Sequence, residues 1–323
     1  MVDIKPTSHT FDMSKVPNYR DLPLVPDTDE RHAWDVFGHD DNLGTINYLS
    51  QDHVLESMKL VKTGKMINLD LPLNQPYRPP ESTGRKTYAH NIYRTPGGGD
   101  DSIDGFYLQA SSQFDSLRHV RFGSRGYYQG LQDEDLDAGD GDRIGIDHWS
   151  RHGIAGRAVL LDLPRFIGPS FDVHARTAMD GPMMEAIAKK QGVEFKPRDI
   201  VLLRTGWMKW YLESESEGPD RMDIAANSPG LDGMRETAEW MWDHRITFFA
   251  GDNIAAEALP PVPRNFQHRR EVPLFGMPIG ELWYFEELAD DCARDGVYEM
   301  LLVAKPLNLP KGVGSPINAL AFK

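Results

Sequence analysis

The sequence contains a single cysteine, Cys292, among its 323 residues. One thiol cannot form an internal disulfide, and the acidic residues around Cys292 would raise its pKa, which argues against a thiolate nucleophile. Long hydrophobic runs are also missing, because the longest ones, residues 158–161 and 301–304, fall far short of the roughly 20 residues that span a bilayer. The first twenty residues lack the apolar centre of a signal peptide. We therefore expect a soluble, cytoplasmic protein.

Basic residues are scarce relative to acidic ones. The chain has 35 Lys plus Arg against 49 Asp plus Glu, a formal charge of -14 and a pI near 5.2. This excess of negative charge repels phosphate backbones and anionic lipid headgroups, so nucleic acids and membranes are excluded as expected partners. A small molecule is the expected partner. The length suits one large domain or two modest domains with a well-buried core.

Several common catalytic motifs are absent. The sequence contains no G-x-S-x-G, no H-E-x-x-H and no C-x-x-C, which excludes the usual serine-hydrolase elbow and the common zinc frameworks. The glycine run at residues 95–101 (TPGGGDD) has no Lys-Ser/Thr after it and carries acids that would repel a phosphate. It predicts a flexible loop. An enzyme with this sequence would depend on histidine and carboxylate, with or without a bound ion.

Short β-type runs bounded by Gly, Pro or Asp predict strands at residues 67–71, 158–163, 200–204, 246–250 and 298–305. Between them, helical spacing and end signals predict helices at residues 182–191, 231–244 and 285–294. This alternation of helices and strands indicates an α/β protein.

The most informative stretch is residues 108–122, LQASSQFDSLRHVRF. If its first half is extended, Gln109, Gln113 and Asp115 lie on one face, with Phe114 on the other. Asp115 and His119 are four positions apart and would meet if the chain turns helical there. The ordinary alternative is a sheet with one solvated face.

The spacing Gln109-x3-Gln113-x-Asp115-x3-His119 resembles the H-x-G-T-H-x-D-x-P-x-H signature of the cyclase family. This family includes bacterial kynurenine formamidases, isatin hydrolases and metal-dependent dienelactone hydrolases. Further segments similar to family blocks follow in the family's order: GIAGRAVLLDL (153–163), IVLLRTGW (200–207), AGDN (250–253), FGMPIGELW (275–283) and the tail 298–322. The resemblance predicts a family domain at residues 65–323, with residues 1–64 as an N-terminal extension wrapped on it.

The resemblance implies a swivelling β/β/α fold with a mixed sheet and flanking helices. It also implies a homodimer or homotetramer that hydrolyses a cyclic or acyl amide, a lactone or a formamide with a divalent ion. Carried over residue by residue, Asp115, His268 and Glu281 match metal ligands and His119 matches the acid/base. Gln109 and Gln113 occupy the two positions at which the signature has histidine.

Because glutamine replaces both signature histidines, the sequence does not decide whether a metal ion is bound or which one. An amide oxygen is a poorer ligand for Zn²⁺ than an imidazole, whereas Mn²⁺ and Mg²⁺ tolerate oxygen donors. One alternative is therefore an oxygen-rich site for Mn²⁺, Zn²⁺ or Mg²⁺. In a second, metal-free alternative, His119 is oriented by Asp115 or Glu281 and activates water, while Gln109 and Gln113 donate to the oxyanion. A third is a non-catalytic protein that binds a small molecule, and a cyclase or dehydratase on a polyketide- or terpenoid-like substrate also stays open.

Each candidate also has an ordinary structural explanation. His119 could cap a strand end, Glu281 could be the first-turn acid of the following helix, and His268, in the basic stretch QHRR, could be an exposed surface residue. Aromatic residues near the matched blocks favour a cyclic or aromatic substrate, although core packing is their more frequent use. These residues are Trp34, Phe37, Phe106, Tyr107, Trp149, Trp207 and Trp283.

Overall fold

The computed structural model describes residues 10–76, 84–138, 141–215, 227–263 and 265–323. Its main feature is a nine-stranded mixed sheet with the order β1-β13-β11-β5-β7-β9-β10-β4-β12 among the described residues. The strands are β1 (Met66–Asn68), β4 (Gln113–Asp115), β5 (Ile154–Asp162), β7 (Ile200–Arg204), β9 (Phe248–Gly251), β10 (Ile279–Glu281), β11 (Glu299–Ala304), β12 (Gly314–Pro316) and β13 (Ala319–Phe322). The predicted α/β fold with a mixed sheet is confirmed.

The centre of the sheet is parallel and covered on both faces. β5, β7, β9 and β10 run parallel, whereas β11 and β4 pair antiparallel on either side of them. Side chains of neighbouring residues on a strand point to opposite faces. On β5, Arg157 forms a buried ion pair with Asp199, while the adjacent Gly156 lies under Leu49 and His53. Burial on both faces explains why the sequences of β5 and β7 are largely continuous apolar runs.

Helices flank this sheet. They are α1 (Gln51–Met58), α2 (Asp133–Asp137), α3 (Ile146–His152), α4 (Leu163–Ile167), α5 (Gly181–Gln191), α6 (Trp207–Glu215), α7 (Arg235–Asp243), α8 (His268–Arg270) and α9 (Glu286–Asp295), followed in the case of α8 by a π-helical turn, η9 (Glu271–Phe275). The ends of α5 follow from local chemistry: Asp180 accepts a hydrogen bond from the Met183 amide, and Gly192 adopts the left-handed conformation that ends the helix.

The predicted helix at residues 231–244 is wrong at its beginning. Leu231 belongs to β8 (Gly230–Leu231), which pairs in parallel with β6 (Ala178–Met179) in a separate two-stranded sheet. The side chain of Asp232 then accepts a hydrogen bond from the Met234 amide, which makes a turn, and α7 begins only at Arg235. Local hydrogen bonding of an aspartate side chain thus overrides the helical spacing here.

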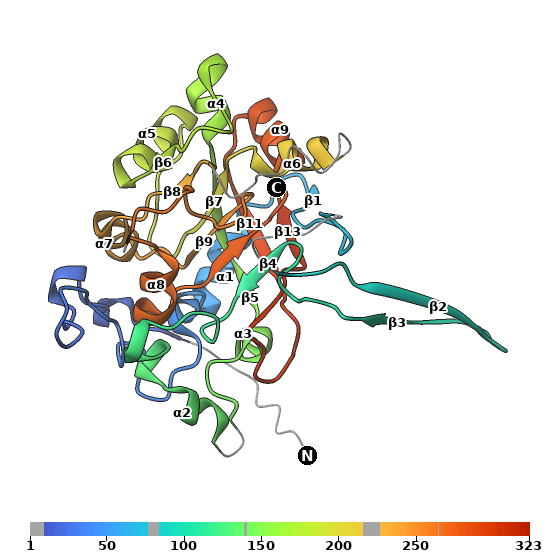
Figure 1. Ribbon diagram of the computed structural model, residues 1–323. Coiled ribbons are helices and arrows are strands. Elements are labelled where there is room, and N and C mark those ends of the chain that lie inside the picture. Colours follow the sequence, from blue (N-terminus) through green and yellow to red (C-terminus); the bar gives the residue numbers. More distant parts are fainter. Residues whose placement is uncertain (1–9, 77–83, 139–140, 216–226, 264) are drawn as a thin grey trace.

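The prediction of a flexible loop at residues 95–101 is also wrong. The chain forms a hairpin of β2 (Ala89–Thr95) and β3 (Gly98–Asp104), in which Thr95 pairs with Gly98. The hairpin extends away from the rest of the molecule (Figure 1). Every residue of both strands is exposed, so there is no buried face, and the alternation of apolar and polar residues that marks a strand in a sequence is absent.

The N-terminal segment is held to the remainder of the chain by backbone contacts. The Tyr19 amide donates to Asp243 Oδ1 (2.6 Å), and the Ala33 amide donates to the Leu274 carbonyl oxygen (2.8 Å). The division into an extension and a domain at residue 64 stays a prediction. Among the described residues, no helix combines the length and apolar character that crossing a bilayer requires.

Candidate functional site

The predicted site residues converge on two neighbouring strands. β4 and β10 are antiparallel, and Gln113 lies directly opposite Glu281. Gln113 and Asp115 share one face of β4, while Phe114 points to the other and packs edge to face against Trp283. The predicted division of faces therefore holds for these three residues. The strand is shorter than expected, because residues 108–112 form turns.

His268 completes this cluster from α8. Its Nε2 atom lies 2.9 Å from Glu281 Oε1 and 3.5 Å from Asp115 Oδ2. The ligand-type atoms of Asp115, His268 and Glu281 all lie within 4.8 Å of one another, and all three residues are buried. The interpretation of His268 as an exposed surface histidine is wrong, because only 5% of its surface is accessible.

Glu257 also belongs to the site, although the sequence does not predict it. Its Oε1 atom accepts hydrogen bonds from the His268 backbone amide (2.8 Å) and from His268 Nδ1 (2.6 Å). The residue is 1% exposed, and its own carbonyl oxygen accepts from Asn253 Nδ2 (3.1 Å). The signal available in the sequence was an acid isolated within the apolar run IAAEALPP. A carboxylate behind an imidazole fixes its tautomer and ring orientation.

Burial and neighbouring charges determine the protonation of this cluster. Burial raises the pKa of Glu281, and the Asp115 carboxylate raises it further, to about 7. Burial also acts to raise the pKa of Asp115, but His119 and His268 outweigh it and hold that pKa below its ordinary value. For His268, burial favours the neutral ring, yet Asp115, Glu257 and Glu281 raise its pKa well above the ordinary value.

His119 lies at the rim of the cluster, with 27% of its side chain exposed. Its Nε2 atom is 3.6 Å from Asp115 Oδ1. Burial lowers the pKa of His119, and Asp115 offsets only part of that effect, so the ring is neutral near pH 7. We therefore assign His119 a neutral ring, with the acid/base chemistry of an uncharged imidazole.

Gln109 links His119 to Asp115. The Gln109 side chain lies over Gly314, where a Cβ atom would come within 2.5 Å of Gln109 Cγ. Its amide nitrogen donates to Asp115 Oδ1 and lies 3.2 Å from His119 Nδ1. Since a carboxylate can only accept hydrogen bonds, the Gln109 amide nitrogen is the donor to Asp115, and the same amide group faces His119 Nδ1. Arg85 Nη1 donates to the backbone carbonyl oxygen of Gln109 at the same edge of the site.

The residues present fit a divalent metal ion. Three buried carboxylates, Asp115, Glu257 and Glu281, surround one imidazole, and burial of uncompensated negative charge is costly. Asp115 Oδ2 and Gln113 Oε1 are buried oxygen atoms with no hydrogen-bond partner among the described residues. Gln113 Nε2 meanwhile donates to Glu281. One imidazole nitrogen with carboxylate and amide oxygens is a donor set suited to Mn²⁺ or Mg²⁺.

Other predicted features lie away from this site. Cys292 is buried in α9, and burial, more than the acids around it, raises the pKa of its thiol to about 11. Trp149, Trp207 and Trp283 are fully buried, so they serve packing. Phe106, at the base of the hairpin, stays partly accessible and contacts Tyr88 edge to face at 5.7 Å.

Comparison with known proteins places this geometry in a family context. Residues 48–258 match the family model described as "Putative cyclase". A solved structure described as a novel cyclase superimposes with a TM-score of 0.80 at 29% sequence identity, covering 90% of this chain and 99% of the other. None of the curated proteins compared with the chain matches it.

More distant structures share the fold. Isatin hydrolase A from Labrenzia aggregata, bound to benzyl benzoate, has a TM-score of 0.56 at 16% identity and covers 80% of this chain and 93% of its own. A predicted metal-dependent hydrolase from Bacillus stearothermophilus has a TM-score of 0.50 at 14% identity, with coverage of 80% and 98%. At these identities the likeness concerns the fold.

Proposed function

Because the chain belongs to the cyclase family, we propose that it is a hydrolase that opens a carbonyl C–N or C–O bond in a small cyclic or acyl amide, a lactone or a formamide. The observation that carries this proposal is the buried cluster of Asp115, His268 and Glu281, with the neutral His119 at its rim. The shared fold with isatin hydrolase A supports hydrolysis. The substrate is a small, cyclic or aromatic molecule.

In this proposal, Asp115, His268 and Glu281 hold a divalent ion, Mn²⁺ or Mg²⁺ in preference to Zn²⁺. When bound, such an ion lowers the pKa of a coordinated water and polarises the substrate carbonyl. With an ion bound, Glu257 would keep the His268 proton on Nδ1 and leave the Nε2 lone pair for the ion. Gln113 holds Glu281 in place through its amide nitrogen.

His119 transfers a proton from the attacking water to the leaving atom. Its side chain is 27% exposed at the rim of the cluster, and the Gln109 amide nitrogen lies 3.2 Å from its Nδ1 atom. The neutral ring takes up the proton that the water loses as its oxygen bonds to the carbonyl carbon, and the resulting imidazolium gives this proton to the nitrogen or oxygen that departs when the C–N or C–O bond breaks. In the structure, the side-chain amides of Gln109 and Gln113 donate to the carboxylates of Asp115 and Glu281. This favours a role in positioning these carboxylates over the alternative role as donors to the oxyanion.

The test is metal analysis combined with hydrolysis assays. We expect about one divalent ion per chain in protein purified without chelator, and hydrolysis of at least one member of a panel of aryl formamides, lactones and cyclic amides. A chelator should abolish turnover, and re-addition of Mn²⁺ or Mg²⁺ should restore it better than Zn²⁺. Full turnover by metal-free protein would contradict the metal-held mechanism. Protein that binds no metal and hydrolyses no member of the panel would contradict the proposed function and favour a binding protein.

A further inference from the structure

Arg85 lies at the edge of the buried cluster, shortly before β2 begins. Its Nη1 atom donates to the backbone carbonyl oxygen of Gln109. The side chain of the same glutamine donates to Asp115 and lies 3.2 Å from His119 Nδ1. A single glutamine residue therefore separates the guanidinium from the His119 ring, and a substrate that meets His119 would lie beside Arg85.

The charge of Arg85 acts on two groups of the site. Burial lowers the pKa of His119, and the charge of Arg85 acts in the same direction. Burial and Asp115 raise the pKa of Glu281, and the charges of His268 and Arg85 oppose that rise. A substrate carbonyl between His119 and Glu281 would therefore lie near this cation.

A guanidinium is suited to bind a carboxylate. It has five N–H donors in a planar fork, so it can pair with both oxygens of a carboxylate in addition to its bond to Gln109. The cluster itself contains three buried carboxylates, those of Asp115, Glu257 and Glu281, and a divalent ion would neutralise only part of their charge. An anionic group of a substrate is therefore directed to Arg85 and away from the cluster.

Two aromatic rings lie at the base of the hairpin, on the segments that carry Arg85 and Gln109. Tyr88 follows Arg85 by three residues, and Phe106 precedes Gln109 by three. The two rings contact each other edge to face with centroids 5.7 Å apart, and both residues are partly accessible. They offer an apolar contact for an aromatic substrate held by Arg85.

Building on the proposed hydrolase function, we propose that Arg85 selects aromatic substrates that carry a carboxylate next to the group that is hydrolysed. The guanidinium pairs with this carboxylate while the scissile carbonyl faces the cluster. Because only Gln109 separates Arg85 from His119, the carboxylate belongs on the ring position adjacent to the scissile amide or ester. No bond of this carboxylate forms or breaks, so Arg85 is a specificity residue.

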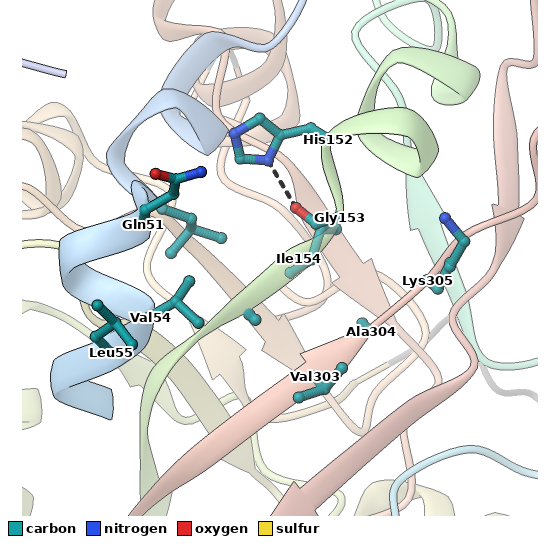
Figure 2. Close-up of a pocket in the computed structure, with 11 residues that line it drawn as sticks. Gln51, Val54, Leu55, His152, Gly153, Ile154, Val303, Ala304 and Lys305 are labelled. Atoms are coloured by element: carbon teal, nitrogen blue, oxygen red, sulfur yellow. Dashed lines mark hydrogen bonds between the residues drawn. The ribbon is translucent and has the colours of Figure 1, made fainter. Parts of the chain in front are cut away.

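A second cation beside a hollow supplies the control position. Figure 2 shows Lys305 at one end of a groove of about 580 Å³ between α1, β5 and β11. Its Nζ atom donates to the Ser150 carbonyl oxygen (2.6 Å). None of the 11 described residues that line this groove belongs to the buried cluster. Lys305→Gln therefore removes a positive charge without changing the proposed carboxylate site.

Calorimetric titration with benzoate and benzamide tests the carboxylate site without requiring turnover. We expect benzoate to bind the protein more tightly than benzamide, and Arg85→Gln to weaken benzoate binding about 30-fold without changing benzamide binding. Arg85→Lys keeps the charge but loses the fork, so it should recover part of the loss. Lys305→Gln should bind benzoate as the wild type does. No binding of benzoate, or equal benzoate affinity in wild type and Arg85→Gln, would overturn the proposal.

Hydrolysis of formanilide and 2-carboxyformanilide separates a failure of this proposal from a failure of the proposed function. The two compounds differ only in the ring carboxylate. We expect Arg85→Gln to lower kcat/KM about 30-fold for 2-carboxyformanilide, mainly through KM, and to leave formanilide nearly unchanged. A wild-type preference for formanilide, or equal losses on both compounds, would overturn the role of Arg85. No hydrolysis of either compound, together with Arg85-dependent benzoate binding, would instead contradict the proposed function and support the carboxylate site.

Discussion

The floor and the rim of the site are built in different ways. On the floor, Asp115 and Glu281 are strand residues, and His268 is held at both its backbone amide and Nδ1 by Glu257. On the rim, His119 lies beyond the end of β4 with 27% of its side chain exposed; its backbone amide donates to the Ser116 carbonyl oxygen (2.9 Å), and its ring lies 3.2 Å from the Gln109 amide and 3.6 Å from Asp115. The floor residues are therefore fixed by the two strands and by the two hydrogen bonds to His268. The side chain of His119, at the rim, can still adjust to a bound substrate.

The two histidines show what this difference does to charge. Both rings are buried enough to favour the neutral form, yet the pKa of His268 rises and that of His119 falls. The number of carboxylates decides the outcome: three surround His268, and one lies 3.6 Å from His119. The carboxylates of the floor therefore favour the charged form of His268, whereas the ring of His119 at the rim stays neutral.

The largest expected effect comes from the floor. Asp115→Asn keeps the size of the side chain but removes one of the negative charges that would hold an ion. We expect loss of bound metal together with a fall in kcat/KM of roughly a thousandfold or more, since ion-assisted charge stabilisation contributes several kcal/mol. Metal content and turnover on the same preparation measure it. Asp133→Asn, at an exposed position, is the control; an Asp115→Asn protein with full metal content would break the assignment of the floor.

A smaller loss is expected at the rim. His119→Ala removes the proton donor but none of the proposed metal ligands, so kcat should fall about 100-fold while metal content stays unchanged. Substrates with an activated leaving group, which need no protonation, should lose much less. His39→Ala is the control, because the His39 side chain is largely exposed and its ring contacts Asp35, which is not a site residue. Equal losses for activated and unactivated substrates would argue against the proton-donor role.

Replacing Glu257 tests whether the fixed orientation of the His268 ring contributes to metal affinity. Glu257→Gln keeps an oxygen that can accept from His268 but removes the charge, and we expect metal affinity to weaken about tenfold. The matched control is Glu271→Gln: burial raises the pKa of Glu271 to about 8, so this side chain is already uncharged at pH 7. Metal titration of both variants gives the comparison. Equal weakening in the two would show that the effect is one of packing, and a positioning role for Glu257 would be lost.

The sequence predicted those parts of the molecule that local chemistry decides. The strand at residues 200–204 agrees with β7 at both ends, and α5 ends where Gly192 adopts the left-handed conformation. The grouping of Asp115, His119, His268 and Glu281 followed from the family signature, and the structure brings these four residues together. Their roles stay predictions.

Contacts between distant segments account for what the sequence did not predict. His268 lies in the basic stretch QHRR, which is ordinarily exposed, but Arg270 is buried because Glu30 pairs with it at 2.8 Å from 240 residues away. Glu257 reaches His268 from a loop that no periodic pattern marks. Every residue of the two hairpin strands is exposed, so the sequence of the strands shows no alternation of apolar and polar residues.

A third imidazole, His53 of α1, separates the effect of burial from that of carboxylates. Its Nε2 accepts from the Arg157 backbone amide (3.4 Å), and burial, together with the charges of Arg198 and Arg157, lowers its pKa to about 4. The unfolded chain takes up this proton near pH 6.5, so the contribution of His53 to stability is complete above that pH and is lost as the pH falls toward 4.

His53→Gln retains an acceptor for the Arg157 amide but cannot titrate. We therefore expect the free energy of unfolding, measured by urea titration at pH 7 and pH 5, to fall by about 1 kcal/mol more in the wild type than in the variant, the full linkage value being reduced because the ring is partly solvated. Replacing His268 should not reduce this fall, because His53 remains, and because the raised pKa of His268 makes its contribution to stability grow as the unfolded chain takes up protons near pH 6.5. An identical pH dependence in wild type and His53→Gln would mean that the pKa of His53 is not lowered in the folded protein.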